Sequence, residues 1–402
     1  MKALVLHPPS HKVSLCDLPR PEPNVGEVLV RVHAVALNPI DALYAFKPIA
    51  TQEQRVIGTD FAGVVVEAST DIADTSDART RLGARVAGFL QGEYVVVPYD
   101  LIWNVPDCLS LETASAVSMC GLTAAQGVFA RLGLPCPFAS TSGFLPFPYR
   151  DTASPINFLI YGSSTSLGLY AAQLVRLSSI TSSRAIRLIG VAGASNHRLL
   201  GQPPYNYDVL VDYHDLDWPD KVWEATGNDG VQYALDCISE GDTVENVHST
   251  LGSEGKLAVF RTPSGGGYNV SKLRIKPIYG AVWEGLGAEI GYNGSDRLPL
   301  VLGTLAHQLL ISLTIYSEEI LPANADARDF AAKFFSFLGT DAKADEIKLE
   351  PNPLRIMPGG LERVVPDGFT LLGKDGVSSR MMNDRLEEYM QPISAQKIVY
   401  PV

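Results

Sequence analysis

The sequence predicts an α/β protein with two domains, a strand-rich N-terminal domain and a doubly wound parallel sheet. Three observations lead to this fold class. Short runs of apolar and β-branched residues, separated by glycines and prolines, fill residues 1–120. From residue 156 onward, apolar strand-like runs alternate with helical segments, which is the order of a parallel sheet covered by helices. The length of 402 residues exceeds what one hydrophobic core usually organises.

Composition limits the classes of function. The chain is 46% hydrophobic and 19% charged, which excludes a disordered or coiled-coil protein. Asp and Glu outnumber Lys and Arg by 44 to 32 without any cationic cluster, so nucleic acid is not an expected partner. No apolar run reaches the ~18 residues of a membrane span, and the apolar start is too short for a signal peptide. The five cysteines never form a C-x-x-C pair, so we expect a cytoplasmic protein without a disulfide framework.

The N-terminal strands are separated by short turns, as in a compact antiparallel barrel. Near alternation of apolar residues predicts strands at 28–35, 63–67, 85–89 and 94–97. The sequence then changes to small helix-forming residues, which predicts one or two helices across 112–133.

The second half of the chain begins with a proline-rich segment, 135–155, in which we expect a long surface loop. The strands expected for the parallel sheet are 157–161, 185–191, 209–211, 231–236 and 256–260, and the helices between them are 167–177 and 218–226. The tail contains a helical stretch at 360–372, an acidic segment at 380–388 and a closing strand at 396–400.

The first strand of the expected parallel sheet leads into a turn of small residues and then a helix. Such a turn presents backbone N–H groups and a helix N-terminus to a pyrophosphate. The candidate residues are Ser164, Thr165, Ser166, Leu167 and Gly168. Because a hydroxyl residue stands where G-x-G-x-x-G has its second glycine, an ordinary strand–helix turn is the alternative. The position at the start of a βαβαβ run favours a dinucleotide site.

The end of the second strand distinguishes NAD from NADP. An acidic residue there would accept a hydrogen bond from the ribose 2′-hydroxyl and repel a 2′-phosphate. This chain has Ser195, Asn196, His197 and Arg198 instead, two polar side chains and a cation without an acid. The sequence therefore predicts NADPH, with a plain solvated loop as the alternative.

Five further motifs carry a family resemblance. They are P-x-x-G-E-V-L-V at 23–30, A-x-N-P-x-D at 36–41, G-x-D-x-A-G at 58–63, G-x-R-V-x-G at 83–88 and S-x-x-K at 394–397. Together they resemble the zinc-independent quinone-oxidoreductase and enoyl-reductase branch of the medium-chain dehydrogenase/reductase superfamily. The resemblance implies a GroES-like β-barrel catalytic domain, 1–125 with 290–402, and a Rossmann NADPH-binding domain, 126–289.

Within that branch, the chain resembles the trans-acting enoyl reductases of fungal polyketide and polyketide–nonribosomal peptide pathways, a group that includes the lovastatin partner enzyme. The proline-rich insertion, Y-G-x-S-T at 161–165, the run at 233–238 and the Asp212–Tyr213 pair carry this likeness. The resemblance implies NADPH reduction of an α,β-unsaturated thioester on the acyl carrier domain of a polyketide synthase. The alternatives are a free-standing quinone or enone reductase and a non-catalytic NADPH-binding partner of a synthase.

Two departures from the subgroup stand out. The 378–392 stretch looks inserted, and Ala42, Leu43 and Tyr44 follow Asp41 where the subgroup has a lysine. Tyr44 is consequently the only side-chain candidate for the proton donor, and water is the alternative.

The resemblance also assigns residues around the cofactor and the acyl chain. Asn38, Pro39, Ile40 and Asp41 would line the nicotinamide side, with an Asx-type turn between two strands as the alternative. Tyr213 would join Ser195–Arg198 at the 2′-phosphate. The remaining cofactor candidates are Val259, Phe260, Ser394 and Ala395. The substrate candidates are Ala125, Gln126, Phe129, Leu132, Gly280 and Ala281, with plain helix core as the alternative for the first four.

Zinc-dependent relatives carry Cys and His ligands at the N-P-x-D and G-x-D positions. This chain has Asn38, Asp41 and Asp60 there and no cysteine cluster, so we expect no metal. Lys272, Arg274, Lys276 and Pro277 lie in the stretch that would supply an edge strand for dimerisation, which predicts a protected edge and a monomer. These cations are also candidates for a basic rim that would receive an acidic carrier domain.

Overall fold

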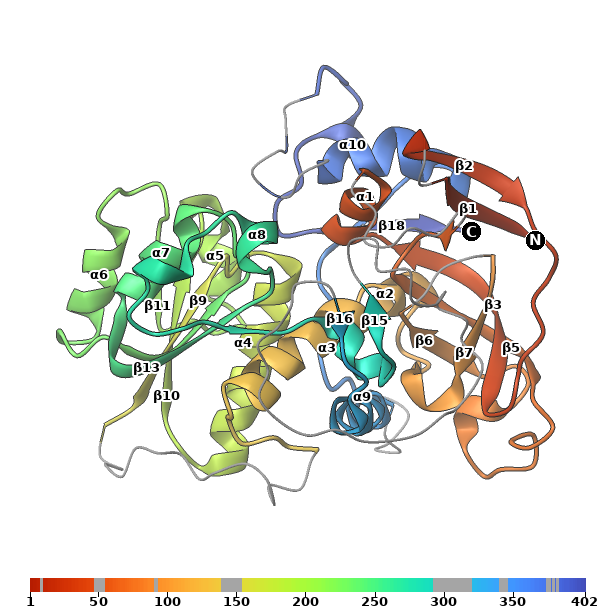
Figure 1. Cartoon of the computed structure of the whole chain (residues 1–402), viewed down its shortest axis with the longest axis horizontal. Coiled ribbons are helices and arrows are strands. Elements are labelled where there is room, and N and C mark those ends of the chain that lie inside the picture. The colour runs from red at the N-terminus through yellow and green to blue at the C-terminus, as the bar shows by residue number, and fades with distance from the viewer. Residues whose placement is uncertain are drawn as a thin grey trace.

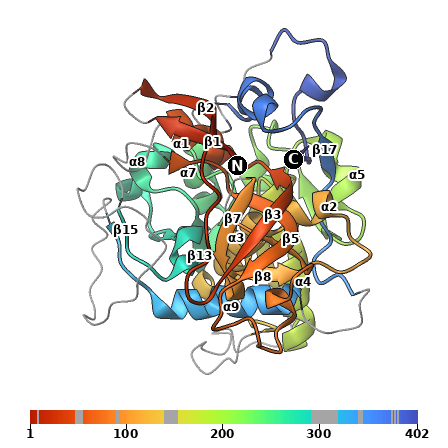
Figure 2. The ribbon, with the colours of Figure 1, turned by 90° about the vertical axis from the view of Figure 1, so that its right-hand side faces the viewer.

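The computed structural model describes residues 1–7, 10–46, 55–89, 93–138, 154–291, 320–339, 346–373, 377, 380 and 383–402. Two domains lie side by side, a β-rich domain and a parallel-sheet domain (Figure 1). Both chain termini lie on the β-rich domain (Figures 1 and 2). No helix in the described ranges is long and apolar enough to cross a bilayer.

The β-rich domain is built around β3 (Glu27–Ala36), whose side chains are almost all buried. β3 pairs antiparallel with β5 (Asp60–Ala68), β7 (Tyr94–Pro98) and β18 (Lys397–Pro401), so the last strand of the chain lies against the third. The other strands are β1 (Lys2–His7), β2 (Lys12–Asp17), β4 (Arg55–Val56), β6 (Arg85–Gly88), β8 (Ile102–Asn104) and β17 (Leu354–Ile356). A separate pair is formed by β15 (Ile290–Gly291) and β16 (Ile320–Leu321).

The second domain holds six parallel strands in the order β11-β10-β9-β12-β13-β14, the 3-2-1-4-5-6 order of a Rossmann sheet. The strands are β9 (Ile156–Tyr161), β10 (Ile186–Val191), β11 (Val209–Val211), β12 (Val231–Asp236), β13 (Leu251–Val259) and β14 (Ile278–Tyr279). The helices are α4 (Ser166–Ser182), α5 (His197–Leu200), α6 (Trp218–Ala225), α7 (Asp242–Ser249) and α8 (Pro263–Gly266). Phe158, Leu159 and Ile160 are fully buried, as expected for a strand covered on both faces.

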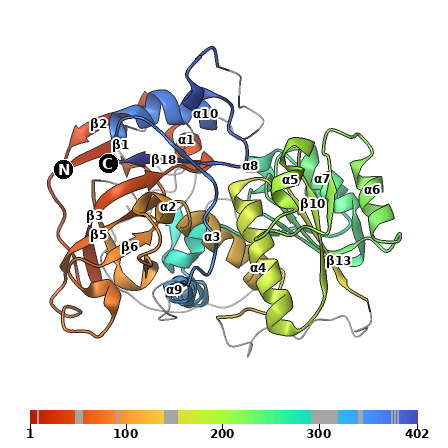
Figure 3. The same ribbon diagram turned by 180° about the vertical axis from the view of Figure 1, so that it is seen from behind.

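Helices of both domains meet at the centre of the molecule. There α3 (Ser118–Ala125), continued by a π-helical turn over Gln126–Arg131, packs along α4 (Figure 3). The Tyr170 hydroxyl of α4 donates to the Ala116 carbonyl and accepts the Asn352 N–H. One buried side chain thereby connects the β-rich domain, the Rossmann domain and the C-terminal tail. The remaining helices are α1 (Pro39–Phe46), α2 (Leu111–Ser115), α9 (Ala325–Leu338) and α10 (Phe369–Leu372), with shorter 3₁₀ or π turns elsewhere.

The structure confirms the predicted strands and the helices across 112–133, and it extends several of them by a few residues. Five helices of the described residues were not predicted, namely α1, α5, α7, α8 and α9, although α9 has an Asn324 N-cap and a regular apolar stripe. Residues 139–153 of the predicted loop lie outside the described residues, as do 378–379 and 381–382 of the insertion. The domain boundaries at 125 and 290 stay predictions; the Rossmann sheet itself spans Ile156–Tyr279.

Candidate functional site

A cavity of about 1330 Å³ lies between the two domains. Its wall includes the carboxyl ends of β9 and β12, where the strand order of the sheet reverses. Open parallel sheets bind ligands at this switch point. The opposite wall comes from α1, α3 and the turn before β18, all in the β-rich domain.

The β9–α4 turn forms one end of the cavity. Gly162 adopts a φ of +71°, and the Thr165 hydroxyl accepts the Gly168 N–H at 3.0 Å, which makes Thr165 the N-cap of α4. Ser164, Thr165, Ser166 and Leu167 line the cavity, and the first turn of a helix leaves N–H groups without intrahelical partners. These residues fit a pyrophosphate.

Gly168 lies behind the turn and does not line the cavity. A Cβ atom there would approach the Gly162 carbonyl oxygen to 2.5 Å and the Ser163 Cα to 2.8 Å. Glycine therefore permits the close contact between strand and helix that the turn needs.

The loops after β10 and β11 form the expected adenosine end. Ser195, Asn196 and Tyr213 line the cavity, as does His214, which sequence reasoning did not select. The ring centroids of Tyr213 and His214 lie 4.0 Å apart. Because His214 directly follows the predicted Tyr213, its position in the sequence could have identified it as a further cavity residue. Asp212 accepts the N–H groups of His214 and Ala194, both at 3.0 Å, and the His214 N–H is the main reason why the pKa of this carboxyl falls to about 2.

Two residues predicted for the 2′-phosphate lie outside the cavity wall. The His197 imidazole contacts the Ala192 carbonyl at 2.9 Å, and Arg198 is exposed on α5. Val259 is likewise buried within β13, whereas Phe260 lines the cavity.

Ser394 and Ala395 line the cavity from the turn before β18. The Asn196 amide donates to the Ser394 hydroxyl at 3.0 Å, which joins this turn to the adenosine-side loop. Ala395 has a φ of +52°, a left-handed conformation that costs energy for a residue with a side chain.

The start of α1 lies on the opposite wall. Asn38, Pro39 and Ile40 line the cavity, but Asp41 is buried beneath the helix. The Asp41 carboxylate accepts the Asn38 N–H at 2.7 Å, which is half of a capping box. Burial raises the pKa of Asp41 to about 7. Asp41 thus holds the start of α1 and does not face the ligand space.

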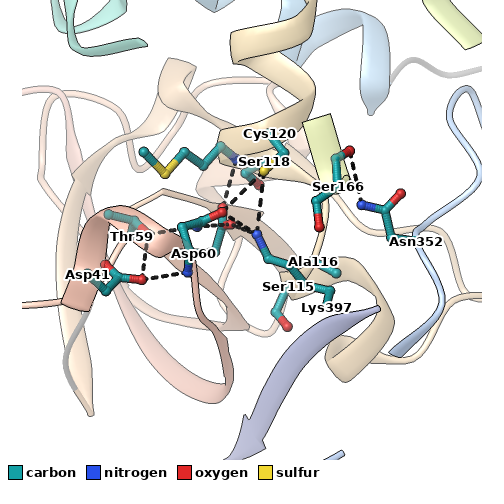
Figure 4. A network of polar contacts seen from close by, with 12 residues as sticks. Asp41, Thr59, Asp60, Ser115, Ala116, Ser118, Cys120, Ser166, Asn352 and Lys397 are labelled. Carbon is teal, nitrogen blue, oxygen red and sulfur yellow. Dashed lines mark hydrogen bonds and ion pairs between the residues drawn. The ribbon is translucent and has the colours of Figure 1, made fainter. Parts of the chain in front are cut away.

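Lys397, which the sequence analysis placed only in the S-x-x-K motif, reaches the cavity wall beside Asn38. Its Nζ donates to Asp60 Oδ2 at 3.0 Å, to Asn38 Oδ1 and to Cys120 Sγ at 3.7 Å (Figure 4). The Asn38 amide donates to Asp60 at 2.8 Å and to Thr59 at 2.7 Å. Every polar atom of the Asn38 side chain therefore has a partner within the protein. Asn38 lines the cavity, but its amide has no N–H group left to donate to a ligand.

Charge and burial oppose each other in this network. Burial raises the pKa of the Asp60 carboxyl, although the Lys397 ammonium acts in the opposite direction. Burial alone would lower the pKa of Lys397, but Cys120 and Asp60 raise it above its usual value. Burial also raises the pKa of the Cys120 thiol.

Aromatic and aliphatic side chains form the remaining end of the cavity. The Tyr44 hydroxyl accepts the Trp283 indole N–H at 3.1 Å, and Phe89 packs on Trp283 with ring centroids 5.9 Å apart. Leu43, Tyr44, Met119, Val282 and Trp283 line this end. Such a surface fits an apolar chain.

The six substrate candidates divide into two groups. Gly280 and Ala281 line the cavity. Ala125, Gln126, Phe129 and Leu132 are buried in the core and do not line it. The apolar pattern of that helix is explained by packing between the domains, which was the alternative for these four residues.

No group of three or more His, Cys, Asp or Glu side chains within the described ranges is placed to hold a metal ion. The space among Asn38, Asp60 and Cys120 is taken by the Lys397 ammonium, a cation supplied by the chain. Metal independence stays a prediction.

Comparison with known proteins agrees with this geometry. Residues 24–132 match the alcohol dehydrogenase GroES-like domain. A trans-enoyl reductase of Penicillium crustosum is 28% identical, with 96% of this chain and 92% of the relative aligned. A trans-enoyl reductase of Trichoderma harzianum is also 28% identical, over 90% of each chain.

Solved structures share the fold at lower identity. A mycobacterial protein in complex with NADPH superposes with a TM-score of 0.64 at 18% identity, covering all of both chains. The CurK enoyl reductase gives 0.65 at 14% identity, covering 100% of this chain and 98% of its own. These findings confirm the predicted fold, a GroES-like domain joined to a Rossmann domain, and the resemblance to the fungal trans-acting enoyl reductases.

Proposed function

We infer that this chain, which has the fold of the medium-chain dehydrogenase/reductase superfamily, is an NADPH-dependent enoyl reductase that acts in trans on a polyketide synthase. Its substrate would be an α,β-unsaturated polyketide thioester held on an acyl carrier domain. One observation supports this most directly: a single cavity has a pyrophosphate-type turn at one end and an apolar aromatic wall at the other. The likeness to trans-enoyl reductases over 96% of the chain supports the same reaction.

The cofactor would lie along the carboxyl ends of the strands. The N–H groups of the β9–α4 turn would bind the pyrophosphate, and Ser195, Asn196 and Tyr213 would contact the adenosine ribose and its 2′-phosphate. Ser394, which is hydrogen-bonded to Asn196, would contact the adenosine side, and Ala395 would cover the cofactor from the same turn. When bound, the reduced nicotinamide supplies the hydride for the β-carbon of the substrate.

The protein's own contribution is orientation and exclusion of water. Pro39 and Ile40 present apolar surface beside the expected nicotinamide position, and Tyr44 with Trp283 shapes the acyl end. The thioester oxygen gains negative charge as hydride arrives, and the α-carbon then needs a proton. Tyr44 is the donor proposed from the sequence.

A carrier-bound substrate implies an interaction with an acyl carrier domain. We propose that this interaction takes place in the cytoplasm. We propose that the enzyme acts as a monomer, because β14, at the edge of the Rossmann sheet, spans only Ile278–Tyr279. Sedimentation at micromolar concentration tests this, and a mass of twice the chain contradicts it.

The decisive experiment measures loss of NADPH fluorescence with an α,β-unsaturated acyl pantetheine and then with the same acyl group on a carrier domain. Both substrates should be reduced, and the carrier-bound form more efficiently. The saturated thioester serves as the blank. If neither thioester is reduced while quinones or free enones are reduced quickly, the protein is a free-standing oxidoreductase. If NADPH binds and none of these substrates reacts, the protein is a non-catalytic NADPH-binding partner of a synthase.

A further inference from the structure

Cys120 lies in the cavity wall within the first turn of α3. Its thiol donates to Asn38 Oδ1 at 3.2 Å and accepts from the Lys397 ammonium at 3.7 Å (Figure 4). The Lys397 side chain is 2% exposed and Asp60 is fully buried. Cys120 itself is a partly exposed residue that lines the cavity, and a buried cation lies against its sulfur atom.

The position of this thiol is fixed by its neighbours in the fold. The Met119 N–H donates to Asp60 Oδ1 at 2.7 Å, which fastens the first turn of α3 to β5. One turn later the Thr123 hydroxyl donates to the Met119 carbonyl at 2.7 Å, so Thr123 lines the cavity with its proton already engaged. The Cys120 proton is engaged too, but more weakly: the sulfur atom lies 3.2 Å from Asn38 Oδ1, an oxygen that already accepts from the Lys397 ammonium. Of these two side chains of α3, Cys120 therefore releases its proton more easily.

We propose that Cys120 is the proton donor to the α-carbon of the substrate and that Lys397 stabilises the thiolate left behind. The proposal rests on the enoyl reduction inferred above and names a different donor from Tyr44. The Tyr44 hydroxyl lies at the aromatic end and accepts the Trp283 indole N–H, whereas Cys120 adjoins Asn38 at the start of α1.

A hydride reaches the β-carbon from the reduced nicotinamide, and the electron pair of the C=C bond moves to the α-carbon and thioester oxygen. The S–H bond of Cys120 breaks and a C–H bond forms at the α-carbon. The thiolate is held beside the Lys397 ammonium until it recovers a proton from water after product release. The enoyl group is reduced and the nicotinamide is oxidised.

The protonation state of the thiol fits this role. Burial around the sulfur atom raises the pKa of the Cys120 thiol, so the thiol carries its proton at neutral pH. Lys397 opposes that shift, whereas the carboxyls of Asp60 and Asp41 reinforce it. The Tyr170 hydroxyl is close enough to interact electrostatically with Cys120, and a negative charge on this thiol raises the pKa of Tyr170. Because thiolate is the nucleophilic form, a protonated Cys120 also avoids adding to the β-carbon of an unsaturated substrate.

The test uses an α-methyl enoyl pantetheine, because protonation of its α-carbon creates a stereocentre. Cys120→Ala and Cys120→Ser are compared with Tyr44→Phe and with Cys108→Ala, an exposed cysteine that serves as the control. Three quantities are measured: kcat, the configuration at the α-carbon and the dissociation constant of NADPH.

Cys120→Ala should lower kcat by ~10²–10⁴-fold and yield a mixture of α-configurations, because water then protonates from either face. NADPH affinity should stay as in the wild type. Cys120→Ser, which keeps a side chain of similar shape, should also lower kcat and yield a mixture of α-configurations. Tyr44→Phe and Cys108→Ala should keep the wild-type configuration. A single configuration from both Cys120 variants overturns the proposal whatever their rate, and so does a mixture from Tyr44→Phe.

A parallel series with an α-methyl enone separates the two inferences. If the wild type reduces the enone but no thioester, the polyketide function is wrong. The configuration at the α-carbon of the enone product then still shows whether Cys120 donates the proton. If no unsaturated carbonyl compound is reduced, both are wrong.

Lys397 acts through Cys120, so its role is measured on the thiol. Peptide-resolved alkylation against pH gives the pKa of Cys120. This pKa should rise in Lys397→Gln and stay near the wild-type value in Lys397→Arg, which keeps the charge. An unchanged or lower pKa in Lys397→Gln, or a raised one in Lys397→Arg, overturns the part assigned to Lys397.

Discussion

The Nζ atom of Lys397 lies 3.0 Å from Oδ2 of Asp60, and the two side chains are 2% and 0% exposed. This ion pair joins the last strand of the chain, β18, to β5 at the wall of the cavity. Removing one partner of such a pair leaves an uncompensated buried charge, which destabilises a protein far more than removing both.

Lys397→Met should therefore lower the free energy of unfolding by about 3–5 kcal/mol at neutral pH. The loss should grow as pH rises. Without Lys397, the already raised pKa of Asp60 rises further, so the folded state holds a proton that the unfolded chain releases from about pH 4 upward. Denaturant unfolding at several pH values measures this effect.

The double variant Lys397→Met with Asp60→Asn is the control for that measurement. It removes both charges, so it should be more stable than Lys397→Met alone, and the added pH dependence should disappear. Equal stability of the two variants at pH 8 would show that the buried charge is not the cause.

Gly168→Ala should destabilise the nucleotide-binding turn. The added methyl group would meet the backbone of Gly162 and Ser163 at 2.5–2.8 Å, and backbone cannot rotate away as a side chain can. We expect a loss of about 1–3 kcal/mol together with weaker NADPH binding. Gly201→Ala, whose nearest neighbour would be at 3.4 Å, is the matched control. A Gly168→Ala protein with wild-type stability would contradict the close contact between β9 and α4.

Arg198→Ala tests the choice of cofactor. Arg198 is exposed on α5, two residues after the cavity-lining Asn196, and a flexible arginine there can reach a 2′-phosphate. One charge-assisted contact contributes ~1.5–3 kcal/mol, so NADPH affinity should fall about tenfold or more while NADH affinity stays nearly constant. Fluorescence titration of both cofactors measures this. Equal affinity of the wild type for both would refute the predicted preference.

The nucleotide turn could be predicted because its signal is local: strand, small residues and helix follow one another within 156–182. The cluster at the cavity wall could not. Lys397 contacts a carboxylate 337 positions away and a thiol 277 positions away, so no sequence window contains it. Its lysine was visible only as part of a closing motif.

The misplaced substrate residues have a different cause. Most of the 125–132 helix is apolar because it packs against α4, β13 and other elements. Periodicity does not distinguish apolar residues that pack in a core from apolar residues that line a ligand cavity. The position of Asp41 was ambiguous for a similar reason. A carboxylate three residues after an Asn–Pro helix start can cap the helix as well as face a ligand.

Metal removal should leave the reaction unchanged. A structural or catalytic zinc site needs soft or borderline ligands in tetrahedral number, and an ammonium occupies the space among Asn38, Asp60 and Cys120. Turnover with a strong chelator should equal turnover without it, and elemental analysis should find no stoichiometric zinc. One zinc per chain would refute this prediction.

Docking of the carrier domain should depend on Lys276. Of the three cations expected at the rim, Lys272 is paired with Glu245 at 3.0 Å, and Arg274 donates to the Ser253 and Gly252 carbonyls at 2.8 and 3.1 Å. Lys276 is exposed and lines the cavity, so its charge lies at the entrance.

An acidic carrier surface would therefore be attracted mainly by this residue. Lys276→Glu should raise KM for a carrier-bound enoyl group by about two- to five-fold relative to the change for the pantetheine thioester, since an exposed ion pair contributes ~0.2–1 kcal/mol. The difference should diminish at high salt, because exposed charges are screened. Lys272→Glu, exposed but placed beside Glu245, is the matched control and should change the ratio less. Equal KM ratios for the two variants at low salt would mean that the carrier does not approach past Lys276.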